Sequence, residues 1–106
     1  MVITGPDVDA LATLTTVLVD ERLCACGQII GGVRSVFRWK GEVGDEAEAR
    51  VALHTTVDLV DAIVARVADL HPYEVPCVLA LPATGGQPAY LAWVRAETRR
   101  AGPAPS

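Results

Sequence analysis

The stretch CACGQIIGGVRSVFRWKGEVGDEAEARVALHT, residues 24–55, decides the fold of this chain. Polar and apolar residues alternate along both of its halves, a pattern typical of strands with one drier and one wetter face. The stretch therefore predicts one long antiparallel hairpin. Arms of this length extend beyond the core of a small domain, so we expect their ends to pair with another copy of the same chain.

Opposite charges predict the register of this hairpin, because directly opposed residues in an antiparallel pair share a face. Two ion pairs would match across it: Arg38 with Glu48, and Lys40 with Glu46. Residues 41–45 would then form the loop, with its two glycines at positive φ. This register would set two aromatic residues on the same side as two alanines: Phe37, Trp39, Ala47 and Ala49.

The rest of the chain predicts strands at residues 2–4 and 75–81, the second buried on both faces, and a helix from Pro88 to about residue 99. Asp7 is a candidate cap for a first helix, and Thr55 or Thr56 for a second that Pro72 stops. The first apolar stripe comprises Val8, Leu11, Leu14, Thr15, Leu18 and Val19. The second comprises Val57, Val60, Ile63, Val64, Val67 and Leu70.

Length and composition bound the class of protein. The chain has 106 residues, 51% of them hydrophobic and 21% charged, and a net charge of -4. These values predict one globular domain over residues 1–100 and a disordered tail at 101–106. Without a basic run, an apolar span or a secretory signal, nucleic-acid and membrane partners are not expected. Three cysteines in such a chain are typical of reduced thiols, which predicts a cytoplasmic protein.

The predicted order is strand, helix, strand, strand, helix, strand, and then a terminal helix. This order predicts an α+β fold of the ferredoxin-like (split βαβ) kind, an antiparallel sheet with two helices on one face. Many unrelated functions share that fold, so function has to come from the side chains.

Three motifs resemble those of the CutA family of divalent-cation tolerance proteins: ERLCAC (21–26) leading into IIGGV (29–33), FRWKGEV (37–43) and LHPYEVP (70–76). PAYLAW (88–93) is a weaker match. The resemblance covers nearly the whole chain and implies a homotrimer, architecturally similar to PII signalling proteins, with a non-catalytic role in tolerance of heavy metals, especially copper. Two alternatives remain: a PII-like trimer that binds a small metabolite between subunits, and a structural trimer whose metal role is indirect.

The chain departs from the usual family pattern at positions that bear on metal chemistry. Cys24 stands where alanine is common, His54 where lysine is typical, and Cys77 where glutamate is frequent, whereas Cys26 occupies the usual cysteine position. Gly27 stands where valine is common. The first three changes add thiol or imidazole ligands.

Cys24 and Cys26 would lie on one face of a strand, about 6.5 Å apart, which is the upper limit for a disulfide. As thiolates they would suit Cu(I); as thiols they would be small buried residues. No CxxC or HxxxH spacing is present, so a closed zinc site within one chain is not expected.

The LHPYEVP motif is the second candidate site. His71 would either cap the second helix or, with Glu74, line a cleft between subunits that takes a cation or a small anion. Trp39 would anchor an interface or cover that cleft. The candidate metal ligands are Cys26, His71, Glu74, Cys24 and Cys77. The candidate cleft or interface residues are Trp39, Arg38, Tyr73 and His54.

Catalysis is not expected, because the chain has no nucleophile elbow, phosphate loop or zinc-protease motif. A Cys26–His71 nucleophile pair would require the fold to bring those two residues together. The expected cofactor is copper or another divalent metal, with no organic cofactor, and the expected partners are metal ions and further copies of the chain.

Overall fold

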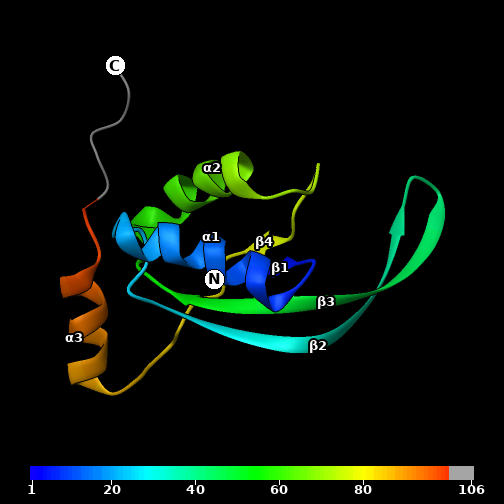
Figure 1. The fold of residues 1–106 in the computed structure, drawn as a ribbon. Coiled ribbons are helices and arrows are strands. Elements are labelled where there is room, and N and C mark those ends of the chain that lie inside the picture. Colours follow the sequence, from blue (N-terminus) through cyan, green and yellow to red (C-terminus); the bar gives the residue numbers. More distant parts are fainter. Residues whose placement is uncertain (101–106) are drawn as a thin grey trace.

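The structure is a computed structural model that describes residues 1–100 (Figure 1). Its elements in chain order are β1 (Val2–Gly5), α1 (Val8–Asp20), β2 (Cys26–Trp39), β3 (Glu42–His54), a 3₁₀ turn (Val57–Leu59), α2 (Val60–Leu70), β4 (Val78–Leu79) and α3 (Pro88–Glu97). Within the described residues, the four strands form one sheet in the order β2-β3-β1-β4, and every neighbouring pair is antiparallel. The expected α+β class with an antiparallel sheet is confirmed. The predicted tail at 101–106 lies outside the described residues.

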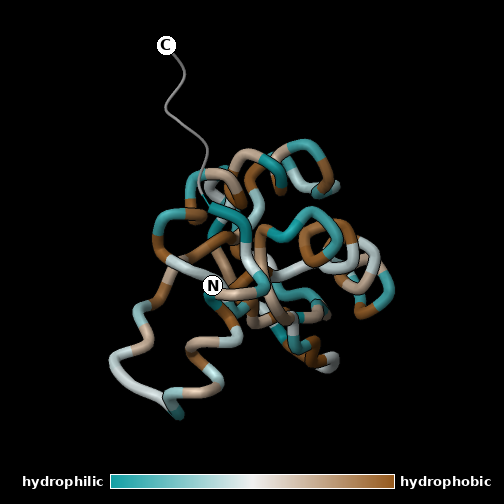
Figure 2. Tube along the Cα trace, turned by 90° about the vertical axis from the view of Figure 1, so that its left-hand side faces the viewer, coloured by the Kyte–Doolittle hydropathy of each residue, from teal (hydrophilic) through white to brown (hydrophobic). Residues whose placement is uncertain are grey.

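Helices α1 and α2 share one buried core with the sheet, while the outer half of the β2–β3 hairpin projects beyond it (Figures 1 and 2). The residues at the centre of this core are Ile3, Leu11, Leu18, Val51, Leu53, Ile63 and Val67. Gly27 lies where α1 crosses the sheet closely: a Cβ added there would come within 2.3 Å of Cγ2 of Thr15. This close approach gives a physical reason for the glycine.

Helix α1 begins as predicted, because Asp7 Oδ1 accepts a hydrogen bond of 2.7 Å from the main-chain nitrogen of Ala10. Its stripe is buried only in part, since Val8 and Val19 are 44% and 40% exposed. The start of the second helix was predicted wrongly. Thr56 makes no capping hydrogen bond, and the Thr55 hydroxyl donates to the Leu23 carbonyl instead.

The residues that follow these threonines form a 3₁₀ turn before α2 begins. Its tighter winding buries Leu59 and leaves Val57 89% exposed, contrary to the predicted stripe. Val64, on the outer side of α2, is also exposed. The helix ends as predicted at His71, whose extended conformation precedes Pro72.

The hairpin exists, but its predicted register is wrong. Arg38 pairs with Val43 and not with Glu48, and Trp39 pairs with Glu42. The loop is a two-residue turn of Lys40 and Gly41, both at positive φ, as two-residue hairpin turns require. Opposite charges were a weak guide, because exposed ion pairs contribute little compared with turn geometry and packing.

Strand β4 is shorter and more exposed to solvent than expected. Only Val78 and Leu79 are in the strand, which lies at the sheet edge and pairs with β1 alone. Leu79 is 56% exposed and Val75 is 65% exposed, so this run is not buried on both faces. Pro76 has no N–H to donate to a longer ladder.

Helix α3 begins at Pro88 as predicted. Its far end is held by Arg22, whose guanidinium donates to the carbonyls of Ala96 (2.7 Å) and Glu97 (3.1 Å). The Arg22 carbonyl also accepts a hydrogen bond from the main-chain nitrogen of Arg99. Through these bonds α3 is fixed against the end of α1.

Candidate functional site

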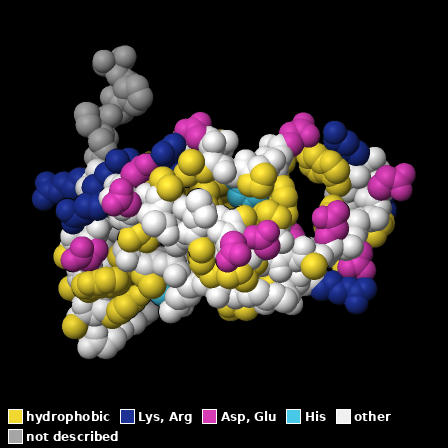
Figure 3. Space-filling view, viewed as in Figure 1, with side chains coloured by type: hydrophobic (Ala, Val, Ile, Leu, Met, Phe, Trp, Pro, Cys, Tyr) yellow, Lys and Arg dark blue, Asp and Glu magenta, His cyan; other side chains and the backbone are white. Residues whose placement is uncertain are grey.

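A cleft of about 870 Å³ lies between the outer part of the hairpin and the chain segment that leads from α2 to β4. Figure 3 shows the opening between the hairpin tip and the body of the molecule. The residues that line it are Thr4, Arg34, Ser35, Val36, Phe37, Arg38, Trp39, Glu46, Glu48, Tyr73, Glu74, Val75, Pro76 and Cys77.

The observed register gives this cleft its chemistry. Ser35 pairs with Glu46, and Val33 pairs with Glu48, so these glutamates share the face of Phe37. Trp39 follows on the same face, opposite Glu42. The predicted register placed alanines on this face, so it did not anticipate that Glu46 and Glu48 line the cleft beside the aromatic residues.

Tyr73 lies in the cleft close to several carboxylates. Its hydroxyl donates to Glu48 Oε2 over 3.0 Å. Burial first, then this hydrogen bond and the charges of Glu48, Glu46 and Asp7, raise the pKa of Tyr73 to about 12. Carboxylates that oppose ionisation of a phenol also favour a cation in the space beside it.

A cation of the chain itself already lies at the tip of the hairpin. Lys40 Nζ is 3.7 Å from Glu74 Oε2 and 5.6 Å from the centre of the Trp39 ring. The side chains of Lys40 and Glu74 are 70% and 73% exposed, so the ion pair is weak. The Lys40 ammonium group nevertheless lies near both the Glu74 carboxylate and the Trp39 ring.

The structure brings together several of the predicted site residues and separates others. Glu74 and Cys77, proposed as metal ligands, line the cleft with Tyr73, Trp39 and Arg38. The other predicted residues lie elsewhere: Cys24, Cys26, His54 and His71.

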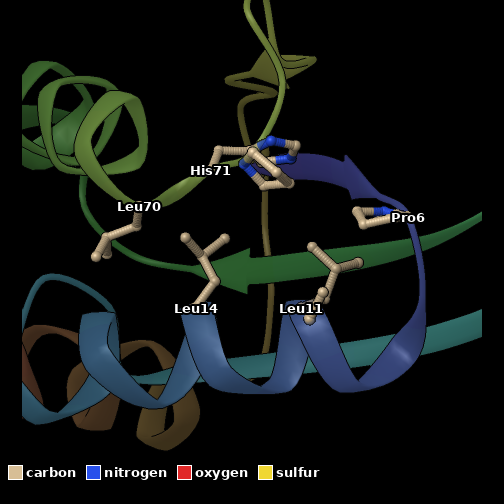
Figure 4. Close-up of a pocket in the computed structure, with 7 residues that line it drawn as sticks. Pro6, Leu11, Leu14, Leu70 and His71 are labelled. Atoms are coloured by element: carbon tan, nitrogen blue, oxygen red, sulfur yellow. The ribbon is translucent and has the colours of Figure 1, made fainter.

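His71 is held within the fold. Its Nε2 lies 2.7 Å from the Thr4 carbonyl oxygen, and its Nδ1 accepts from the main-chain nitrogen of Tyr73 over 3.1 Å. Since the carbonyl only accepts, Nε2 carries the proton, and both ring nitrogens are occupied. Figure 4 shows His71 beside a cavity of about 20 Å³, which is the size of one water molecule. His71 therefore does not pair with Cys26.

Cys24 is 1% exposed, and burial, followed by the charge of the neighbouring Cys26, raises the pKa of its thiol to about 11. Cys26 is half-buried and pairs across the hairpin with His54. Tyr90, absent from the predicted sites although its motif was recognised, joins them: its hydroxyl lies 2.6 Å from His54 Nδ1. Burial raises the pKa of Tyr90, followed by the charge of Cys26 and a hydrogen bond to it.

Residues 1–100 contain neither a metal-binding cluster of side chains nor a membrane-spanning helix. No three or more His, Cys, Asp or Glu side chains gather there in a group that could hold a metal ion. No helix of this part is long and apolar enough to span a bilayer.

The fold and the cleft define a small α+β protein with a long hairpin over an acidic and aromatic cleft. The family model for the CutA1 divalent ion tolerance protein matches residues 1–97. The chain belongs to this family, as its motifs indicated.

Its relatives agree along most of this chain. A divalent-cation tolerance protein CutA from Thermus thermophilus is 40% identical over 98 residues, which cover 92% of this chain and 95% of the relative. A solved structure of the divalent cation tolerance protein from the same organism has a TM-score of 0.89 over the same shares of both chains. The chloroplastic protein CutA of Arabidopsis thaliana is 37% identical over 92% of this chain and 53% of its own length. The matched family and the relative from Thermus thermophilus are named as tolerance proteins and not as enzymes.

Proposed function

We propose that this chain acts, without catalysis, in the response to heavy-metal ions by binding a divalent cation, copper foremost, in the cleft beneath the hairpin tip. The observation that carries the proposal is the carboxylate lining of the cleft, where Glu48 Oε2 accepts a hydrogen bond of 3.0 Å from the Tyr73 hydroxyl and Glu46 lies beside it. Glu74 and Cys77 add a carboxylate and a thiol along the same cleft. Copper accepts both of these ligand types.

A second copy of the chain would complete such a site. The described residues of one chain offer no group of three ligands, whereas copper sites commonly have three or more. Apolar side chains are exposed around the hairpin, with Val36 at 67% and Val43 at 68%. Exposed apolar surface of this kind marks protein contacts. We therefore propose a homotrimer in which Trp39, Arg38 and Tyr73 lie at or near subunit contacts.

The proposal extends to domain organisation and location. The element order and the strand order β2-β3-β1-β4 support one ferredoxin-like domain over residues 1–100. Three free cysteines support a reducing compartment, for which we propose the cytoplasm.

The short turn of the hairpin argues against the PII-like alternative. A regulatory trimer of that kind would need a long mobile loop, and the hairpin loop here has only Lys40 and Gly41 between its strands. The cleft is nevertheless large enough for a small metabolite. Thermal-shift screening of metabolites against metals separates the two functions.

Native mass spectrometry of the reduced protein, alone and with one equivalent of Cu(II) per chain, tests the proposal. Zn(II) serves as a redox-inert comparison. We expect a trimer that carries a fixed number of ions, with uptake reduced in Glu74→Gln and Cys77→Ser. Glu97→Gln, on exposed α3, is the matched control and should not change uptake. A trimer without metal would overturn the binding function, and a monomer would overturn the shared site.

A further inference from the structure

The cleft beneath the hairpin tip is far larger than a metal ion (Figure 3). Its volume of about 870 Å³ lies in the range of pockets that hold small organic molecules. Within residues 1–100, no group of three or more metal-ligating side chains occurs. The cleft therefore has room for an organic ligand, and its walls indicate the chemistry of that ligand.

Aromatic rings line the hairpin side of the cleft. Phe37 and Trp39 lie two positions apart on β2, so they share one face, and they are 40% and 44% exposed. The Phe37 ring lies against Gly44, where an added Cβ would come within 2.5 Å of its Cζ. Tyr73 adds a third ring from the segment between α2 and β4. Open ring faces of this kind attract both apolar groups and cations.

Carboxylates lie along the same cleft. Glu46 and Glu48 are two positions apart on β3, so they share one face and their Cα atoms are about 6.5 Å apart. Glu48 Oε2 accepts a hydrogen bond from the Tyr73 hydroxyl, and Glu46 is exposed. Glu74 adds a third carboxylate from the segment between α2 and β4.

Two arginines also line the cleft, but contacts within the hairpin engage them. Arg34 donates to both carboxylate oxygens of Asp45, over 2.9 and 2.7 Å. Asp45 is not among the lining residues, so the charge of Arg34 is balanced from outside the cleft. Arg38 Nη1 donates to the Gly41 carbonyl over 3.5 Å. The glutamates therefore leave an excess of negative charge in the cleft.

A ligand that complements these walls carries positive charges joined by apolar links. In a linear polyamine, ammonium groups alternate with short runs of methylenes, a spacing similar to that of side chains two positions apart on a strand. We propose that the cleft binds a linear polyamine, whose ammonium groups pair with Glu46, Glu48 and Glu74 and whose chain lies along the aromatic rings. The inference goes beyond the proposed function and does not depend on metal binding.

Lys40 makes the contacts expected of such a ligand and should compete with it. Its Nζ is 3.7 Å from Glu74 Oε2 and 5.6 Å from the centre of the Trp39 ring. Because both charged side chains are largely exposed, a ligand can displace this weak pair. Lys40→Asn removes the ammonium group and suits the positive φ of the turn, where Asn-Gly is favoured. This variant should bind a polyamine about two- to threefold more tightly.

Isothermal titration calorimetry with spermidine tests the site. We expect saturable binding to the wild type, whereas a neutral alkanediol of the same chain length should not bind. Glu48→Gln removes one charge while its amide oxygen can still accept from Tyr73, and it should weaken binding by about three- to tenfold. Glu97→Gln makes the same change in net charge on exposed α3 and should leave the affinity unchanged.

Trp39 tests the aromatic wall. Trp39→Leu keeps an apolar side chain but removes the ring, and it should weaken spermidine binding by about three- to tenfold. Native mass spectrometry checks that this variant keeps the oligomeric state of the wild type. The chain has two tryptophans, so Trp93→Phe leaves Trp39 as the fluorescent reporter. Its emission should change with spermidine and not with the diol.

The inference is wrong if spermidine does not bind, or if the diol binds equally well. It is also wrong if Glu97→Gln weakens binding as much as Glu48→Gln, since this would indicate general attraction to an acidic protein. Cys77→Ser separates the inference from the proposed function, because it should reduce copper uptake and leave spermidine binding unchanged. A chain that takes up copper but not spermidine would overturn the inference alone.

Discussion

The imidazole of His71 joins the end of α2 to the end of β1, because its Nε2 donates to the Thr4 carbonyl oxygen 2.7 Å away. The two residues are 67 positions apart in the sequence. On its other side the ring accepts from the main-chain nitrogen of Tyr73, the first cleft residue of this segment. His71 thus sets the position of the segment that forms one wall of the cleft.

Replacing His71 with alanine should lower the free energy of unfolding by about 1–3 kcal/mol, because it leaves the partly buried Thr4 carbonyl and Tyr73 N–H without the imidazole as their partner. Urea denaturation with an unchanged m-value measures this loss. Val57→Ala is the control, since Val57 is exposed and its truncation should change stability by less than about 0.5 kcal/mol. Equal stability of His71→Ala and the wild type would show that these bonds contribute nothing.

Two glycines of the hairpin should respond to alanine for different reasons. A Cβ on Gly44 would lie 2.5 Å from Cζ of Phe37, whereas a Cβ on Gly41 would meet nothing within 4 Å. Gly41→Ala should cost about 1–2 kcal/mol through its positive φ of 81°. Gly44→Ala should cost about 1–3 kcal/mol through overpacking.

A double-mutant cycle separates these causes. Phe37→Ala should recover most of the loss in Gly44→Ala, because the ring that the new methyl group meets is gone. The same change should recover nothing in Gly41→Ala. Equal coupling of Phe37→Ala to both glycines, measured by denaturation, would contradict this explanation.

These glycines also show how far the sequence predicts the hairpin. Alternation correctly identified the two strands, and Val51 and Leu53, two positions apart on the second arm, are both buried, as a strand with one drier face requires. The register was wrong because ion pairs of exposed residues were used to set it. The bulge between Ile30 and Val33, with Gly32 at positive φ, further shifts the pairing along β2.

The candidate site was predictable only where it depends on local motifs. Tyr73 and Glu74 follow directly from the LHPYEVP motif, and both line the cleft. Glu48 could be placed beside Tyr73 only with the correct register. The contact of Tyr90 with His54 spans 36 positions and two elements whose packing no local pattern encodes.

The Glu21–Arg66 ion pair should make stability depend on pH. Arg66 Nη2 lies 2.8 Å from Glu21 Oε2, and its Nε lies 2.9 Å from Oε1. The hydrogen bond to Arg66 is the largest cause that lowers the pKa of Glu21. A carboxyl whose pKa is lower in the folded chain stabilises it above the ordinary glutamate value of about 4.3. That stabilisation is lost as the pH falls through the lowered value.

Comparison of the wild type with Glu21→Gln across pH tests this dependence. The wild type should be more stable at pH 7, and the difference in unfolding free energy should shrink as the solution is acidified. Asp45→Asn, in the more exposed pair with Arg34, is the control and should show a smaller difference because solvent screens that pair. A Glu21→Gln difference that is constant across pH would contradict the expected linkage.

The three thiols should differ in their rates of alkylation in the native protein. Cys24 is buried and its pKa is raised to about 11, so only about one molecule in a thousand carries its thiolate at pH 8. Cys77 is exposed and Cys26 is half-buried. Mass spectrometry after timed iodoacetamide treatment should find Cys24 modified last, and unfolding in urea should remove the difference. Modification of Cys24 as early as Cys77 in the folded chain would show that its region opens readily, and would restore it as an accessible metal ligand.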